Sequence, residues 1–201
     1  MGRGPIHAGS IRKIGMPYIN DEVSEIIANI ESETGDKTLA QSIQFSPTAF
    51  THVKRTVEAG GTIVADTMAV ISEIDASLLE GTGTKICCFL EDAQVMRLAE
   101  MRRTTRAEVA VDVGLSLKGP KLMVVSSAPT ALSRILCRRQ HEPLSDVCVL
   151  AAPTGFASVV QLKEKLRDSD MAFIVVRGKQ GGTAITGTIL NQILYRIRQM
   201  K

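Results

Sequence analysis

Two cations and three glycines stand together near the end of the chain, in the segment RGKQGGT (177–183). An apolar run precedes this segment, and a pattern typical of a helix follows it. Glycines let a ligand approach the backbone, and the first turn of a helix offers free N–H groups. The segment therefore predicts a loop that binds an anion, and the remaining question is which anion.

Nucleotide phosphates are poor candidates for this anion. The phosphate-binding pattern GxxxxGK[ST] is matched neither by GTGTK (81–85) nor by GKQGGT (178–183). A dinucleotide fingerprint after the first strand is also missing. A hydrolase is equally poorly supported, since the sequence has no GxSxG motif and no histidine near a candidate serine.

The composition argues against several other classes of partner. Four cysteines and three histidines show no ligand spacing, so we expect no metal site and predict reduced thiols in a cytoplasmic protein. A net charge of +3 with 3% aromatic residues gives little basis for binding nucleic acid. No apolar run reaches the length that a membrane-spanning helix needs, so we expect no membrane partner.

Five short apolar segments alternate with helical patterns from residue 62 onward. They are rich in β-branched residues and do not alternate with polar ones, which is typical of strands covered on both faces. The expected fold is a three-layer α/β/α sandwich around a mostly parallel sheet of about five strands, forming one domain over residues 1–201. The segments are TIVAD (62–66), KICCFL (85–90), KLMVVSS (121–127), DVCVLAAP (146–153) and MAFIVVRG (171–178).

The first sixty residues are expected to be mainly helical after an irregular or shortened segment, 1–19. Asn20 is typical of a helix N-cap, and TGDK (34–37) ends that helix. A second short helix is expected to run through Leu39, Ala40 and Ile43. Ser46-Pro47 then predicts an N-cap followed by the first residue of a third helix, which ends at Ala59.

Polar or glycine residues follow each of the five expected strands. In parallel sheets the ligand site lies at the carboxyl ends of the strands. Turns favour the same residue types, but five such loops on one edge predict a site there. The loops are 66–68, 91–92, 126–130, 153–156 and 177–183.

Several of these segments together resemble the precorrin-8X methylmutases, also called precorrin isomerases, of corrin-ring biosynthesis. The resemblance extends from about Asn20 to about Ile193. Its most specific parts are the Arg-Gly-x-x-Gly-Gly segment and APTAL. The similar segments are FSPTAF (45–50), EAGGTIVADTMAV (58–70), TTRAEVA (104–110), APTAL (128–132), PTGF (153–156) and VVRGKQGGTAITGTILN (175–191).

The resemblance implies a methyl migration on the macrocycle, from precorrin-8X to hydrogenobyrinate, or the same step on the cobalt-containing counterpart. It implies no cofactor, and a homodimer with its pocket at the subunit contact. Carboxylate arms would be the anions: one held by Arg177, Lys179 and the amides of Gly181, Gly182 and Thr183, another by Arg106 unless that arginine is only solvated. Asp66 would order the site, and the other matching candidates for substrate binding are Thr105, Ser127 and Thr130.

The sequence departs from the family at the residue expected to protonate the ring. The ungapped frame from Thr34 to Pro47 places the family's histidine position on Ser32, and a family arginine position on Asn29. Two interpretations stay open. The protein is an isomerase that obtains its proton from water held by Ser32, or from His7 or His52. Alternatively, it is a relative that binds a tetrapyrrole without converting it, as a carrier or regulatory protein.

Overall fold

The computed structural model describes residues 18–200 and contains one six-stranded sheet in the order β1-β6-β5-β4-β2-β3. Five strands are parallel, and β1 pairs with β6 in the antiparallel direction. The predicted mostly parallel sheet is confirmed. The strands are β1 (Ile43–Phe45), β2 (Thr62–Ala65), β3 (Lys85–Cys88), β4 (Lys121–Val125), β5 (Val147–Ala151) and β6 (Ala172–Val176).

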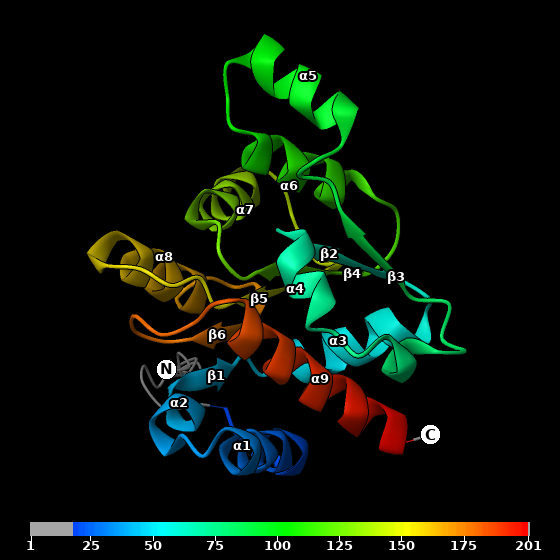
Figure 1. Ribbon diagram of the computed structural model, residues 1–201, viewed down its shortest axis with the longest axis vertical. Coiled ribbons are helices and arrows are strands. Elements are labelled where there is room, and N and C mark those ends of the chain that lie inside the picture. Colours follow the sequence, from blue (N-terminus) through cyan, green and yellow to red (C-terminus); the bar gives the residue numbers. More distant parts are fainter. Residues whose placement is uncertain (1–17, 201) are drawn as a thin grey trace, which may run out of the picture.

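Helices cover both faces of the sheet (Figure 1). One layer holds α1, α3, α4 and α9, and the other holds α6, α7 and α8. The three-layer sandwich is thus confirmed. The helices are α1 (Asp21–Thr34), α2 (Lys37–Ser42), α3 (Ala49–Glu58), α4 (Met68–Ser72), the 3-10 helix η1 (Ala76–Leu79), α5 (Ala93–Arg102), α6 (Arg106–Ser116), α7 (Pro129–His141), α8 (Ala157–Arg167) and α9 (Thr183–Gln199).

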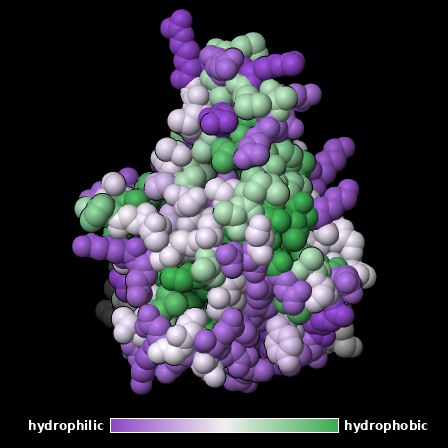
Figure 2. All heavy atoms as spheres, viewed as in Figure 1, coloured by the Kyte–Doolittle hydropathy of each residue, from purple (hydrophilic) through white to green (hydrophobic). Residues whose placement is uncertain are grey.

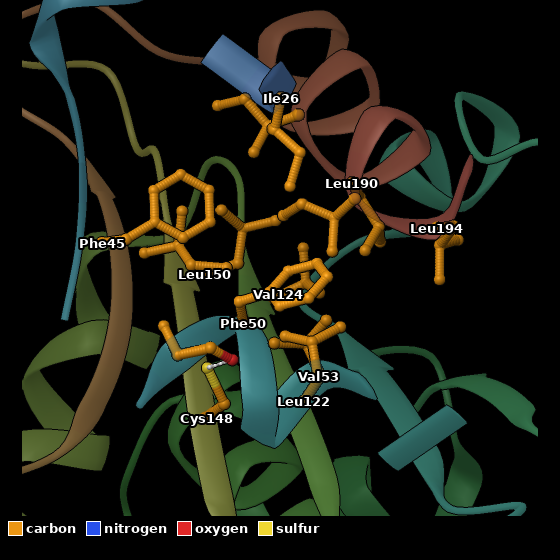
Figure 3. Close-up of a cluster of buried hydrophobic side chains, with 14 of the residues drawn as sticks. Ile26, Phe45, Phe50, Val53, Leu122, Val124, Cys148, Leu150, Leu190 and Leu194 are labelled. Carbon is orange, nitrogen blue, oxygen red and sulfur yellow. Dashed lines mark hydrogen bonds between the residues drawn. The ribbon is translucent and has the colours of Figure 1, made fainter. Parts of the chain in front are cut away.

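The central strands are apolar on both faces because each face has its own core. On β5, Cys148 and Leu150 point into the core beneath α1, α3 and α9, whereas Val149 points into the core beneath α7 and α8. Figure 3 shows the first core, where the Cys148 thiol approaches the carbonyl oxygen of Ala49. This double coverage explains why the strand segments show no alternation with polar residues.

The region before residue 50 corrects two predictions. Ile43 was expected in a helix, but it begins β1, which makes six strands instead of about five. Ser46 was expected to cap α3, but its hydroxyl accepts the Phe173 N–H at 2.9 Å, and its own N–H donates to the Phe173 carbonyl at 2.8 Å. Ser46 therefore extends the pairing of β1 with β6. The helix starts at Ala49, after Thr48.

The helix α5 projects from the body and is held through α6 (Figure 1). Val95 and Ala99 of α5 pack against Val109 of α6 in a small separate cluster. Asp112 of α6 binds Arg134 and Arg138 of α7 at 2.7–2.9 Å. Burial alone would raise the pKa of Asp112, but hydrogen bonds from these two arginines lower it below its usual value. This ionic network fixes α6, and with it the start of that helix.

The predicted irregular segment 1–19 lies outside the described residues except for Tyr18 and Ile19. Within residues 18–200, no helix is both long and apolar enough to cross a membrane. The same part of the chain holds no cluster of three or more histidine, cysteine or acidic side chains that could bind a metal ion.

Candidate functional site

The parallel strands bring their carboxyl ends to one edge of the sheet. β2 pairs with β3 on one side and with β4 on the other, and both pairings are parallel. The chain first leaves β2 toward β3 and later crosses back to β4, so β2 and β4 flank the topological switch point. Ligands of such sheets bind in the crevice outside this point. The prediction that the five polar loops share one edge is confirmed.

Asp66, at the end of β2, holds the loop that follows β4. One carboxylate oxygen accepts the backbone N–H groups of residues 126, 127 and 128 at 2.8–2.9 Å. The other oxygen accepts the Ser126 hydroxyl at 2.6 Å. The negative charge lies at the start of α7, where it also interacts favourably with the helix dipole. These bonds occupy the amides that an external anion would need, while the Ser127 and Thr130 side chains stay exposed beside them.

An apolar surface adjoins Asp66. Met68 and Ala69 begin α4 and are exposed, Met68 to 52%. Figure 2 shows apolar side chains gathered over α4 and β3. The helix α4 packs tightly against α9, because a Cβ atom on Gly187 would come within 2.3 Å of the Glu73 Cβ. The end of α4 therefore stands beside the second turn of α9, and the exposed start of α4 lies about one turn away along its helix.

The loop between β6 and α9, residues 177–182 and here called the β6–α9 loop, carries the two predicted cations. The Arg177 Nε donates to Glu164 of α8 at 3.0 Å, and the arginine side chain is 44% exposed. An exposed pair of this kind contributes little to stability. The bond uses one of the five guanidinium donors, so others remain for an anion. The Lys179 amine lies 6.0 Å from the centre of the exposed Phe156 ring.

The glycines of the β6–α9 loop serve a close approach to β5. A Cβ atom on Gly181 would lie 1.9 Å from the Ala152 carbonyl oxygen, so no larger residue fits there without a shift of the backbone. The Gly182 N–H donates to the same oxygen at 2.7 Å. This corrects the expectation that the Gly182 amide faces a ligand. The N–H of Thr183, at the first turn of α9, has no protein partner within residues 18–200.

Lys163 of α8 is a residue of this site that the sequence analysis missed. Its side chain is fully buried, and its amine donates to the carbonyl oxygens of Gly178 at 3.0 Å and Gln180 at 2.7 Å. Burial lowers the pKa of Lys163 to about 8. The spacing of the sequence could have predicted that Lys163 is buried. It lies four residues after Val159 and three before Leu166, which are both buried, so it falls on the apolar stripe of its helix.

The segment TTR (104–106) forms the start of α6. The Thr105 hydroxyl caps the helix by accepting the Glu108 N–H and donating to the Glu108 carboxylate. Hydrogen bonds, first from Thr104 and then from Thr105, lower the pKa of Glu108. The Thr105 hydroxyl is thus engaged in the cap, which corrects its expected contact with a ligand. Arg106 is exposed and lines an open cavity of about 550 Å³ with Met96, Ala99, Glu100, Arg103 and Thr104.

Ser32 lies on the outer face of α1. It follows the fully buried Val23 by nine positions, or two and a half turns, which places it on the opposite face of the helix. Its neighbour Glu33 accepts the side-chain amide of Gln192 at 2.7 Å. Gln192 lies about 13 Å along α9 from its first residue. Ser32 is therefore exposed to solvent and apart from the β6–α9 loop of its own chain.

The residues after Ser32 that define its register have a structural role. Gly35 ends α1 in a left-handed conformation, with φ of 66° and its N–H bonded to Glu31. Asp36 then caps α2 by accepting the Leu39 N–H at 2.8 Å. The Thr-Gly-Asp sequence thus ends α1 and begins α2. This turn is required whether or not a histidine precedes it.

The structure corrects the choice of His52 as an acid. Burial, and then Arg55, lower the pKa of His52, while Asp146 acts in the opposite direction. Asp146 precedes β5, so His52 lies at the amino edge of the sheet, opposite the five loops. His52 lies at that edge because α3 crosses the sheet from the end of β1 and then leads into the start of β2. His7, the other candidate, lies outside the described residues.

Comparison with known proteins identifies the family. The model of the precorrin-8X methylmutase family matches residues 9–196. The chain belongs to the precorrin-8X methylmutase family. A cobalt-precorrin-8 methylmutase of Salmonella typhimurium is 30% identical over 175 residues, which cover 87% of this chain and 81% of the relative. A cobalt-precorrin-8 methylmutase of Priestia megaterium is 26% identical over 90% of this chain and 80% of the relative.

Solved structures of the precorrin-8X methylmutase family share the fold. A precorrin-8X methylmutase related protein superimposes with a TM-score of 0.80 at 24% identity, covering 90% of this chain and 94% of the other. The precorrin-8X methylmutase of Thermus thermophilus gives a TM-score of 0.78 at 23% identity, covering 94% and 91%. The chain thus shares its overall fold with these two proteins.

Proposed function

We propose that the protein is an isomerase of cobalamin biosynthesis that moves a methyl group between neighbouring carbons of precorrin-8X or of its cobalt-containing counterpart. The observation that carries the proposal is the extent of the family match, which includes every loop at the carboxyl edge of the sheet. The step is a rearrangement within one molecule, so atoms and electrons balance without an oxidant or a second substrate. Neither the described residues nor the comparisons favour the non-catalytic alternative.

The carboxyl edge offers two kinds of surface to such a macrocycle. The exposed residues Met68 and Ala69 at the start of α4 suit the apolar face of a conjugated ring. Arg177, Lys179 and the free N–H of Thr183 suit the carboxylates on its rim, since guanidinium binds carboxylate in a bidentate way. Because α4 stands beside α9, one ring can reach both surfaces. Asp66 keeps the neighbouring loop in place without exposing its own charge to the substrate.

A second carboxylate arm is assigned to Arg106. This residue is exposed at the start of α6, and within residues 18–200 it forms no ion pair that would compete with a ligand. Since α6 runs back from the carboxyl edge toward the start of β4, its first residue lies at the same edge as the β6–α9 loop. The side chains of Ser127 and Thr130 are exposed after β4, at the same edge of the sheet. We place them along the path of the ring, between Arg106 and Arg177.

For the proton that the rearrangement needs, we propose water held by Ser32. The Ser32 hydroxyl is exposed and faces away from its own sheet, so it can meet a bound ring only across a contact between two copies. This supports a homodimer whose contact completes the pocket. Light scattering at micromolar concentration should give twice the mass of the chain, and a monomer would remove both the dimer and this role of Ser32.

We also propose that the protein works in the cytoplasm. The cysteines Cys87, Cys88, Cys137 and Cys148 are all free, although Cys137 is exposed on α7. Free thiols persist in reducing compartments, whereas secreted proteins of similar size often oxidise them.

The binding part of the proposal is tested by charge reversal at two matched arginines. Arg177→Glu removes an exposed, ion-paired arginine from the carboxyl edge, and Arg55→Glu removes an exposed arginine paired with Asp146 at the amino edge. Titration with hydrogenobyrinate should show an affinity loss of about tenfold or more for the first variant. The second should bind like the wild type. Equal affinity of both variants would remove Arg177 as an anchor.

A further inference from the structure

Lys163 holds the β6–α9 loop from behind with an amine that solvent does not reach. Its partners in the structure are two carbonyl oxygens, those of Gly178 and Gln180. Removing an ammonium group from water is costly unless its protons find acceptors. A methionine or leucine would fill the same space without the free-energy cost of burying an amine. The role of Lys163 is therefore sought in its two hydrogen bonds and not in its packing.

The two bonds fix the direction of two peptide groups. In a trans peptide the C=O and the N–H point in opposite directions. The Gly178 carbonyl shares its peptide with the Lys179 N–H, and the Gln180 carbonyl shares its peptide with the Gly181 N–H. Because Lys163 holds both carbonyls toward α8, both N–H groups point away from α8. Within residues 18–200, neither N–H has a hydrogen-bond partner.

No other bond within the described residues sets this part of the loop. The loop is attached at its start, where the Arg177 N–H donates to the Ser42 carbonyl, and at its end, where Gly182 binds Ala152. Between them lie two glycines with positive φ, Gly178 at 72° and Gly181 at 152°. Glycine allows many conformations, so the bonds from Lys163 select one of them.

We propose that Lys163 is a positioning residue for substrate binding, which turns the N–H groups of Lys179 and Gly181 outward so that together they bind one carboxylate of the macrocycle. The proposal rests on the function proposed above and names the donors of one of its subsites. Backbone N–H groups that point to the same side of a short loop can form a concave site for an anion. The amine also polarises the two peptides from behind, which strengthens both N–H donors.

The test replaces the amine and compares it with a matched lysine on the same helix. Lys163→Met keeps the bulk and removes both bonds, Lys163→Gln keeps a shorter donor, and Lys165→Met removes an exposed amine two residues further on. Lys163→Met should bind hydrogenobyrinate about tenfold more weakly, since two donors lose their orientation. The affinity of Lys163→Gln for hydrogenobyrinate should lie between those of Lys163→Met and the wild type. Lys165→Met should bind as tightly as the wild type.

Kinetics separate positioning from a general loss of structure. A contact to one arm acts equally in the ground state and the transition state, so Lys163→Met should raise KM and leave kcat within about threefold. A variant that only unfolds in part would lose kcat through its active fraction at unchanged KM. Thermal unfolding of all three variants, followed by circular dichroism, sets a temperature at which each is folded.

The pH dependence gives a second signature. Burial brings the pKa of Lys163 to about 8, so the affinity of the wild type should fall as the pH rises through 8, and Lys163→Met should lack this step. The difference between the two proteins isolates Lys163 from the other charged and titratable groups of the elements near it. In the loop and on α8 these are Arg177, Lys179, Glu164, Lys165 and Arg167, and on α7, which packs against α8, they are Arg134, Arg138, Arg139 and His141.

The outcomes distinguish this proposal from the proposed function. If the wild type binds and converts the macrocycle and Lys163→Met has the same KM and affinity, the positioning role is wrong. If the wild type neither binds nor converts it, the proposed function is wrong, and hydrogen exchange decides the role of Lys163. The N–H groups of Arg177 and Gly182, which bond to Ser42 and Ala152 at the two ends of the loop, are the protected ones. Faster exchange of these two amides in Lys163→Met than in Lys165→Met then supports a role of Lys163 in ordering the loop, and equal exchange overturns it.

Discussion

Replacing Asp66 by alanine should destabilise the protein because its carboxylate accepts five hydrogen bonds. Two of the donors, the N–H and the hydroxyl of Ser126, belong to a fully buried residue and would lose their partner without access to water. The other three, which are the N–H and the hydroxyl of Ser127 and the N–H of Ala128, are nearer the surface and can turn to solvent. An unsatisfied buried donor costs about 1–3 kcal/mol, so we expect a loss of about 2–4 kcal/mol in the free energy of unfolding.

Asp92 provides the control for this prediction. It is an exposed carboxylate at the start of α5, where it accepts the N–H groups of Gln94 and Val95 at 2.7 and 3.3 Å. Asp92→Ala should cost about 1 kcal/mol, as for a typical helix cap. The protein has no tryptophan, so urea unfolding is best followed by far-ultraviolet circular dichroism. If Asp66→Ala abolishes turnover but costs no more stability than Asp92→Ala, Asp66 acts on the substrate directly and the ordering role is refuted.

Three further variants test other parts of the site. Gly181→Ala should weaken hydrogenobyrinate binding at least tenfold with a Tm loss of a few degrees, because a Cβ atom would lie 1.9 Å from the Ala152 oxygen. Ser32→His should increase turnover, and the gain should disappear above the ordinary imidazole pKa of about 6.5; a slower Ser32→His would place the acid elsewhere. Between pH 8 and 10.5 the unfolded chain keeps the proton that folded Lys163 loses. Denaturation should therefore show the stability of the wild type rising relative to Lys163→Met, and equal slopes would contradict the lowered pKa.

Much of the fold could be predicted because the central strands are buried on both faces. Segments such as VCVLA (147–151) carry that signal in their composition alone. The strand β1 could not be predicted in the same way. Its three residues are too few to show a period, and its extended form depends on pairing with Val176, Val175 and Ile174, more than a hundred residues away. Ser46 was misassigned for the same reason, since its partner Phe173 is equally distant.

The sequence predicts which loops form the site better than it predicts which of their atoms are free to bind a ligand. Strand ends identify an edge, so the placement of Asp66 and of the β6–α9 loop followed from topology. Which backbone groups are free depends on contacts across the fold, as when Gly182 gives its N–H to Ala152. His52 is a candidate acid by residue type, but only the crossing of α3 shows that it stands at the opposite edge. Lys163 was missed because a lysine is ordinarily assigned to the surface.

The central claim is that the chain converts precorrin-8X, although the resemblance to the family predicts serine, Ser32, at the position of the family's histidine. The direct measurement is the absorption spectrum of precorrin-8X, and in parallel of cobalt-precorrin-8, during incubation with the wild type and with Arg177→Glu. We predict that the wild type produces the spectrum of hydrogenobyrinate, or its cobalt form, and that the variant needs more substrate to reach the same rate. A spectrum that shifts on binding and then stays unchanged, at every enzyme concentration, would contradict the isomerase and leave a tetrapyrrole-binding protein.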